Sequence, residues 1–216
     1  MANSNGSFGL RPISKLGGGA NSTGLTGYTP YEIASDNSDK IYHGQLVIPL
    51  ASGYIDHTAN AAGGTVSHLG VFQGCEYVSS TTGKTIWSNY WPGSGADSNH
   101  PVKAFVYDDP NQLFVVATGD NTGAATEALV RADVFANCAL KDGNSGSTTT
   151  GISSATADLN TAAATNTLAL RIVGVEDDTV NADFTALGIG LIVRINNHFN
   201  APTGSIVQGT VSTTGV

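Results

Sequence analysis

Apolar and polar residues alternate in short runs along most of the chain, a pattern typical of β-strands and not of long helices. Seven segments have this character: 28–33, 41–50, 67–78, 102–107, 112–118, 168–175 and 189–196. Pro49 suits the end of a strand, and Gly70 and Gly74 indicate bulges or strong coiling within their segment. The pattern predicts an all-β fold, with a single β-sandwich or barrel-like domain over residues 28–200.

The segments 102–107 and 112–118 flank the sequence Asp-Asp-Pro-Asn at 108–111. Pro110 presets the backbone angle of a type I turn, and the Asx side chains can cap its open backbone groups. This arrangement predicts a β-hairpin.

The last two apolar segments each have one apolar side. If they pair, Arg171 and Arg194 share one face of the sheet, either as solvated charges or as part of an ion pair or docking contact.

One short helix is expected near 125–131, where Leu129 and Val130 could face the sheet. The stretch 141–167 consists almost entirely of small and polar residues, which predicts a long surface excursion outside the core.

The two ends of the chain differ from this middle part. Residues 1–27 are rich in Gly, Ser and Asn, which predicts an extended arm with Phe8, Leu10, Ile13 and Leu16 as apolar anchors for a neighbouring protein. A frayed terminus is the alternative. Residues 201–216 carry no charge and are expected to form a polar tail.

Composition excludes several classes of function. Nine Lys and Arg against seventeen Asp and Glu give a net charge of −8, which repels nucleic-acid phosphates. The N-terminus has neither a basic start nor an apolar run, so we expect no secretory signal and synthesis in the cytoplasm. No segment has the apolar length of about 20 residues that a membrane-spanning helix needs.

Residues that could carry chemistry do not form a recognisable motif. Cys75 and Cys138 are far apart and are expected to be buried free thiols. Asp56 and His57, with His68 further on, could ligate a metal, but no third ligand stands at a recognisable spacing. The sequence contains neither a GxSxG motif nor a complete phosphate-binding loop. We therefore expect no enzyme activity, no cofactor and no metal.

Trp87, Tyr90 and Trp91 form the densest aromatic group in the chain. Three interpretations are open: packing in the core, an anchor in a protein interface, or a platform on which a sugar stacks.

The order of several segments resembles a family of tailed-bacteriophage virion proteins, the capsid decoration or cement proteins. The similar segments are MANSNGSFGLRPI at the start, HLGVFQGCEYV, VYDDPNQLFVV, LALRIVGV and LIVRINNH. The resemblance covers residues 3 to about 197, and the stretch 143–167 fits it least well.

This resemblance implies a virion structural protein on the outer capsid surface that cements neighbouring subunits of the major capsid protein. It implies no active site or cofactor. A homo-oligomer is expected, a trimer in preference to a dimer, with no direct contact to nucleic acid or membrane. A tail or fibre role, or a carbohydrate-binding adhesin, is the alternative.

The expected partner contacts are Phe8, Leu10, Arg11, Ile13, Leu16, Trp87, Tyr90 and Trp91. Deletion of residues 1–19 is accordingly expected to weaken capsid binding with little change in melting temperature.

Overall fold

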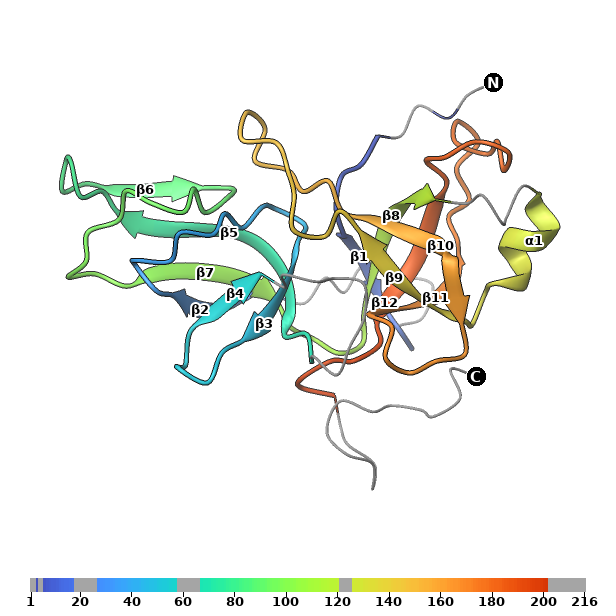
Figure 1. Cartoon of the computed structure of the whole chain (residues 1–216), viewed down its shortest axis with the longest axis horizontal. Coiled ribbons are helices and arrows are strands. Elements are labelled where there is room, and N and C mark those ends of the chain that lie inside the picture. The colour runs from blue at the N-terminus through green and yellow to red at the C-terminus, as the bar shows by residue number, and fades with distance from the viewer. Residues whose placement is uncertain (1–2, 4–5, 18–26, 58–66, 121–125, 202–216) are drawn as a thin grey trace.

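The computed structural model describes residues 3, 6–17, 27–57, 67–120 and 126–201, and these residues form two β-sheets side by side (Figure 1). Each sheet has six strands. Sheet A contains β1 (Arg11–Lys15), β8 (Gln112–Asp120), β10 (Thr156–Ala163), β9 (Asn137–Lys141), β11 (Leu170–Val175) and β12 (Gly190–Ile195). Sheet B contains β2 (Thr29–Ile33), β7 (Val102–Tyr107), β5 (Gly70–Val78), β3 (Leu46–Pro49), β4 (Ile55–His57) and β6 (Thr85–Ser88). The expected all-β class is confirmed.

Sheet A is closed. The strands β8, β10, β9, β11 and β12 pair in this order, and β12 pairs with β8 again, so these strands form a barrel with β1 added to β8. Closure leaves no open edge among the barrel strands. The last two strands of the sequence, β11 and β12, pair with each other and place Arg171 opposite Arg194. Nε of Arg171 donates to Oδ1 of Asn137 at 3.1 Å.

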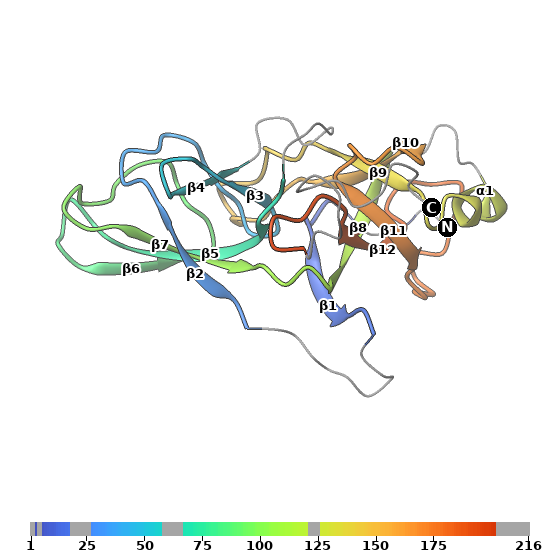
Figure 2. The same cartoon turned by 90° about the horizontal axis from the view of Figure 1, so that it is seen from below.

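Sheet B folds over itself. The strands β2, β7, β5 and β6 lie on one side of this lobe and β3 and β4 on the other (Figure 2). Large apolar side chains fill the space between them, including Ile33, Phe72 and Trp91, all of which are fully buried. The bulge expected in the third segment is present between Phe72 and Gly74.

The two cores abut. Leu46 and Val71 belong to strands of sheet B, yet they pack in the same apolar cluster as the interior of sheet A. The segment 42–45 between the sheets also receives hydrogen bonds from several parts of the chain. For example, the amide of Leu10 donates to the carbonyl of Gly44 at 2.8 Å, and the amide of Ser153 donates to that of His43 at 2.9 Å.

The hairpin prediction at 102–118 is wrong, because β7 belongs to sheet B and β8 to sheet A. The loop between them passes from one sheet to the other. Asp108 accepts hydrogen bonds from the hydroxyls of Thr29 and Tyr31 in β2, at 2.9 and 2.7 Å. Asp109 forms an ion pair with Lys15 of β1 at 2.7 Å. The turn-forming residues thus fasten the crossing to both sheets.

The expected surface excursion at 141–167 is also wrong in part, because 156–163 form β10 inside the barrel. Ala155, Ala157 and Leu159 are buried there. The short helix is confirmed as α1 (Glu127–Ala132), with Thr126 as its N-cap. Val130 is buried, whereas Leu129 is exposed.

Candidate interaction surface

The outward side of sheet B carries a group of aromatic rings. Alternation along β7 directs Ala104 and Val106 into the core and Phe105 to the opposite side. The Tyr28 ring packs edge-on against Phe105 at 5.0 Å, and the Trp87 ring stacks on Phe105 at 5.5 Å with an interplanar angle of 2°. Tyr107 lies 6.2 Å from Tyr28. We call these four residues, Tyr28, Trp87, Phe105 and Tyr107, the aromatic face.

Gly74 explains how rings from separated strands meet. Trp87 lies in β6 and Phe105 in β7, and β5 runs between these two strands. The residue of β5 directly opposite Phe105 is Gly74. A Cβ at Gly74 would lie 2.9 Å from the carbonyl oxygen of Ser88, so a glycine is needed where β5 approaches the chain that follows Trp87. Gly74 therefore allows the close approach of the chain segments beside these two rings.

Two hollows open on this side of sheet B. The first has a volume of about 280 Å³ and is lined by Tyr28, Trp87 and Phe105 together with the polar residues Gln73 and Asn89. The second has a volume of about 360 Å³, and its lining includes Glu32, Glu76, His100 and Lys103. Lys103 pairs with Glu76 at 3.8 Å. An apolar hollow thus lies on the same side as a charged one.

Exposure distinguishes Trp87 from its sequence neighbours. Trp87 is 68% exposed, and Tyr28 is 53% exposed. Trp91 is fully buried, its Nε1 donates to the carbonyl of Asn37 at 3.2 Å, and its ring lies edge-on to Tyr77. Tyr90 stacks on Tyr42 at 5.8 Å, away from the other two. The three aromatic residues at 87–91 do not form one platform, and only Trp87 belongs to the aromatic face.

The other residues expected at an interface lie at the N-terminal end of the described chain. Leu10 is 1% exposed and belongs to the core of sheet A, while Arg11, Ile13 and Leu16 lie in or next to β1, which pairs with β8. The guanidinium of Arg11 sits 5.1 Å from the centre of the Phe8 ring. Burial corrects the expectation for Leu10 and Trp91, because neither side chain is presented to a partner in this structure. The remainder of the arm, 18–26, and the tail at 202–216 lie outside the described residues.

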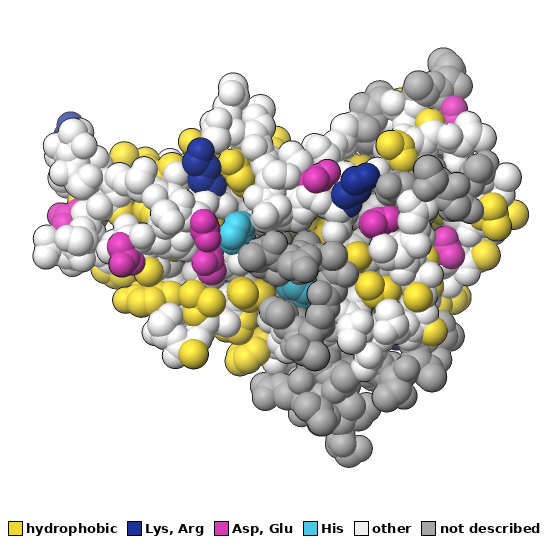
Figure 3. All heavy atoms as spheres, viewed as in Figure 1, with side chains coloured by type: hydrophobic (Ala, Val, Ile, Leu, Met, Phe, Trp, Pro, Cys, Tyr) yellow, Lys and Arg dark blue, Asp and Glu magenta, His cyan; other side chains and the backbone are white. Residues whose placement is uncertain are grey.

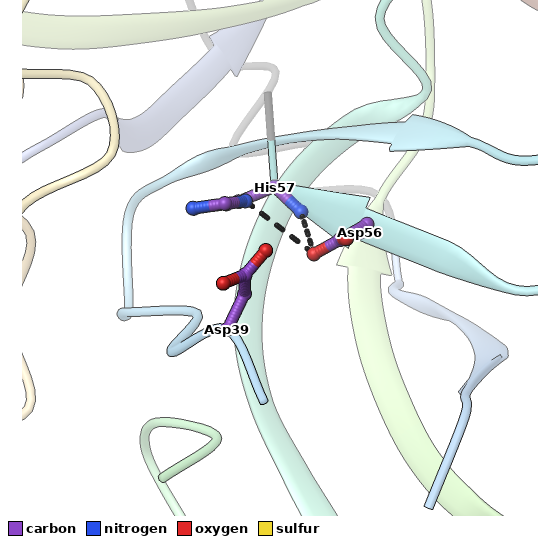
Figure 4. A group of neighbouring side chains, drawn as sticks. All are labelled: Asp39, Asp56 and His57. Atoms are coloured by element: carbon purple, nitrogen blue, oxygen red, sulfur yellow. Dashed lines mark hydrogen bonds and ion pairs between the residues drawn. The ribbon is translucent and has the colours of Figure 1, made fainter. Parts of the chain in front are cut away.

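A second group of functional side chains lies at the end of β4. Asp39, Asp56 and His57 bring one ligand atom each to within 4.8 Å of one another (Figure 4). Burial acts to raise the pKa of Asp56, but hydrogen bonds from His57 and Asn37 outweigh it and hold that pKa below its ordinary value. Contact with the Asp56 carboxylate raises the pKa of His57. The third member is thus Asp39, and not His68 as the sequence suggested.

His68 lies instead beside His198, where the two sheets meet. The His68 amide donates to the carbonyl of Asn197 at 2.7 Å, and the Phe199 amide donates to the carbonyl of His68 at 2.8 Å. Both imidazoles are almost fully buried, and burial lowers the pKa of each to about 4. Both cysteines are free and buried, as expected, and burial raises the pKa of each thiol to about 12.

Sequence reasoning missed the exposed Tyr28 and the half-buried Phe105 and Tyr107, the last of which also packs against the core of sheet A. The alternation in VKAFVY contained the signal, since it places Lys103, Phe105 and Tyr107 on one side of a strand. Figure 3 shows hydrophobic side chains gathered along the lower rim of the sheet B lobe, with charged side chains scattered above them. The described part of the chain contains no helix long and apolar enough to span a membrane.

Searches against protein-family models, curated proteins and solved structures find no match to this chain.

Proposed function

We propose that the chain is a virion structural protein that binds the outer surface of an icosahedral phage capsid and cements neighbouring major capsid protein subunits. The observation that carries the proposal is the aromatic face. Tryptophan and tyrosine are the side chains most enriched among residues that dominate binding energy in protein interfaces. Trp87 leaves two thirds of its surface in water, although the same lobe buries Trp91 completely. An exposed aromatic group of this kind is typical of a docking site.

The charged residues beside the aromatic face support the same proposal. Glu32, Glu76 and Lys103 line the hollow next to it. An apolar centre with a polar rim is the usual organisation of a protein interface. The net charge of −8 disfavours contact with packaged DNA and suits a position outside the shell.

Attachment to a symmetric shell favours a homo-oligomer, and we propose a trimer in preference to a dimer. Several aromatic faces held in one oligomer would engage several capsid subunits at once. Effective concentration then raises the overall affinity by about two to four orders of magnitude without any new contact. The resemblance to decoration proteins described above supports this arrangement.

A carbohydrate-binding role in a tail, fibre or adhesin is the second candidate. The observation that favours it is the apolar hollow beside Trp87, where Gln73 and Asn89 add hydrogen-bonding groups to an exposed aromatic ring. Sugars stack on such rings and bond to such amides. Buried Trp91 would not respond to a sugar, so a change in tryptophan fluorescence on adding host polysaccharide would report on Trp87 and favour this candidate.

Co-sedimentation with capsids that lack the protein tests the capsid proposal. Trp87→Ala should weaken binding by about thirtyfold or more, because truncation of a residue that dominates an interface costs about 2 kcal/mol or more. Its melting temperature should change little, since the side chain is largely exposed in the free protein. Leu129→Ala is the matched control, because Leu129 is an exposed apolar residue on α1, outside sheet B, and should leave binding unchanged.

Equal capsid binding by the Trp87→Ala variant and the unsubstituted protein would contradict a docking role for the aromatic face. Loss of polysaccharide binding with intact capsid binding would instead assign this face to carbohydrate recognition.

A further inference from the structure

The group Asp39, Asp56 and His57 is assembled from two separate parts of sheet B. Asp56 and His57 end β4, whereas Asp39 lies in the connection between β2 and β3. Figure 4 shows the Asp39 carboxylate and the His57 ring on the same side of Asp56. In the part of the chain that the structure describes, these three side chains have ligand atoms close enough to one another to share a metal ion.

The nitrogen of this group is enclosed and faces the carboxylate of Asp56 (Figure 4). Nδ1 of His57 is inaccessible to solvent and has no hydrogen-bond partner among the described residues. It lies 3.4 Å from Oδ1 of Asp56, and the His57 side chain as a whole is 11% exposed. This nitrogen therefore has an ion-pair contact but no hydrogen bond of its own, and in the neutral imidazole its lone pair can bind a metal ion.

The two carboxylates also retain free oxygen atoms. Among the described residues, two groups donate a hydrogen bond to the Asp56 carboxylate: the backbone amide of His57 and the side-chain amide of Asn37. Both bonds go to the same oxygen, Oδ1. This arrangement fixes the orientation of the carboxylate and leaves Oδ2 available. Asp39 is exposed and lies on a connecting segment, so its carboxylate can approach a shared ion.

We propose that Asp39, Asp56 and His57 bind one zinc ion. One imidazole and two carboxylates are ligands that Zn²⁺ accepts, at about 2.0–2.2 Å each, with water completing a tetrahedral site. The imidazole nitrogen favours zinc over Mg²⁺ and Ca²⁺, which prefer oxygen ligands throughout. The two negative charges neutralise the ion. The hydrogen bond from Nδ2 of Asn37 to Oδ1 of Asp56 is the kind of outer contact that orients a ligating carboxylate.

Bound zinc would join the connection at 34–40 to the end of β4. The same connection accepts the hydrogen bond from the buried ring of Trp91, through the carbonyl of Asn37. The ion would therefore hold one side of the sheet B core closed. Because a ligand that binds only the folded state stabilises it, zinc should raise the melting temperature.

Equilibrium dialysis of the full-length chain against zinc, after removal of metal with a chelator and with excess Mg²⁺ present, tests the proposal. Bound zinc is counted by mass spectrometry. The unsubstituted protein should bind one equivalent and melt at a higher temperature with zinc than with chelator. Asp39→Asn and His57→Gln should each weaken zinc binding at least tenfold and abolish the thermal shift.

Asp36→Asn is the matched control, because Asp36 is an exposed aspartate on the same connection that is not in the group, and it should behave as the unsubstituted protein. Asp39→Asn changes an exposed side chain, so it keeps the test valid if His57→Gln unfolds the protein. Absence of bound zinc in the unsubstituted protein would overturn the proposal. Undiminished binding by Asp39→Asn would also overturn it, since the zinc would then be held by other surface groups.

Discussion

At the scale of residues, the contrast between Trp87 and Trp91 shows how local geometry decides whether a tryptophan is exposed or buried. Trp87 lies in β6, a short strand on the outside of sheet B. The chain then turns, and the hydroxyl of Ser88 donates to the carbonyl of Tyr90 at 2.6 Å. After this turn, the backbone of Trp91 bonds to that of Ile41 and its ring enters the core. Two tryptophans close in sequence therefore have opposite environments.

The buried histidines His68 and His198 predict how stability depends on pH. Burial lowers the pKa of both to about 4, although the carboxylates of Asp108 and Asp109 act to raise the pKa of His198, and His198 itself lowers that of His68. In the unfolded chain a histidine binds a proton below about pH 6.5. Between these values the unfolded state binds more protons, so the free energy of unfolding should fall as the pH is lowered from about 6.5 to about 4.

Urea unfolding at a series of pH values between 4 and 8 measures this dependence. The double substitution His68→Gln and His198→Gln removes both titrating groups and should flatten the curve over that range, whatever it does to stability at pH 8. The carboxylates titrate in both proteins and therefore cancel in the comparison. A slope that is the same in the two proteins would show that these histidines do not control acid sensitivity.

At the scale of elements, β1 changes the meaning of the N-terminal segment. Gly9 has a φ of +71°, and a Cβ there would lie 2.6 Å from the carbonyl oxygen of Gly44. A glycine is needed at this close approach. It allows Leu10 to enter the core of sheet A and the next residues to pair with β8. The described part of the N-terminal segment is therefore built into the chain's own fold.

Deletion of residues 1–19 should for this reason destabilise the protein, contrary to the expectation from sequence alone. A matched pair of substitutions isolates the cause, because Leu10 is 1% exposed and Leu16 is 44% exposed. Leu10→Ala should lower the free energy of unfolding by about 2–5 kcal/mol, as for other buried leucines. Leu16→Ala should change it by less than about 0.5 kcal/mol. Urea unfolding curves would contradict this account if the two variants were equally stable.

Sequence patterns predicted elements with large alternating side chains and missed those without them. Strands such as β2, β11 and β12 were predictable because isoleucine, leucine and valine mark their buried sides. The strand β10 was missed because its buried residues include the small Ala157, which fills the limited space inside a narrow barrel. The loop at 108–111 has the residues of a turn, but these residues also suit a crossing between sheets. Local sequence does not distinguish the two.

The two candidate sites could not be predicted from the sequence alone, because each is formed by residues that only the tertiary fold brings together. Asp39 is distant from Asp56 in sequence and joins it only because the connection after β2 returns alongside β4. The aromatic face needed strand order, since Trp87 and Phe105 meet across Gly74 of the strand between them. Composition could indicate the class of fold, but it could not place side chains from different strands on one side of a sheet.

At the scale of the whole molecule, the two lobes have different structural characters. Sheet A is a closed barrel, which protects its strand edges, whereas sheet B presents the aromatic face and its two hollows. Leu46 and Val71 of sheet B pack in the core of sheet A, so the two lobes are joined by buried apolar contacts. In the proposed role, sheet B docks on the capsid and sheet A provides a stable body.

The copy number of the chain in purified virions, measured by quantitative mass spectrometry against the major capsid protein, tests the central proposal most directly. A shell-decorating cement protein should be present at a ratio near one, or at a simple fraction that amounts to hundreds of copies per particle. A dozen copies or fewer would contradict the proposal and indicate a portal, tail or fibre component. Absence from the virion would exclude a structural role in the particle.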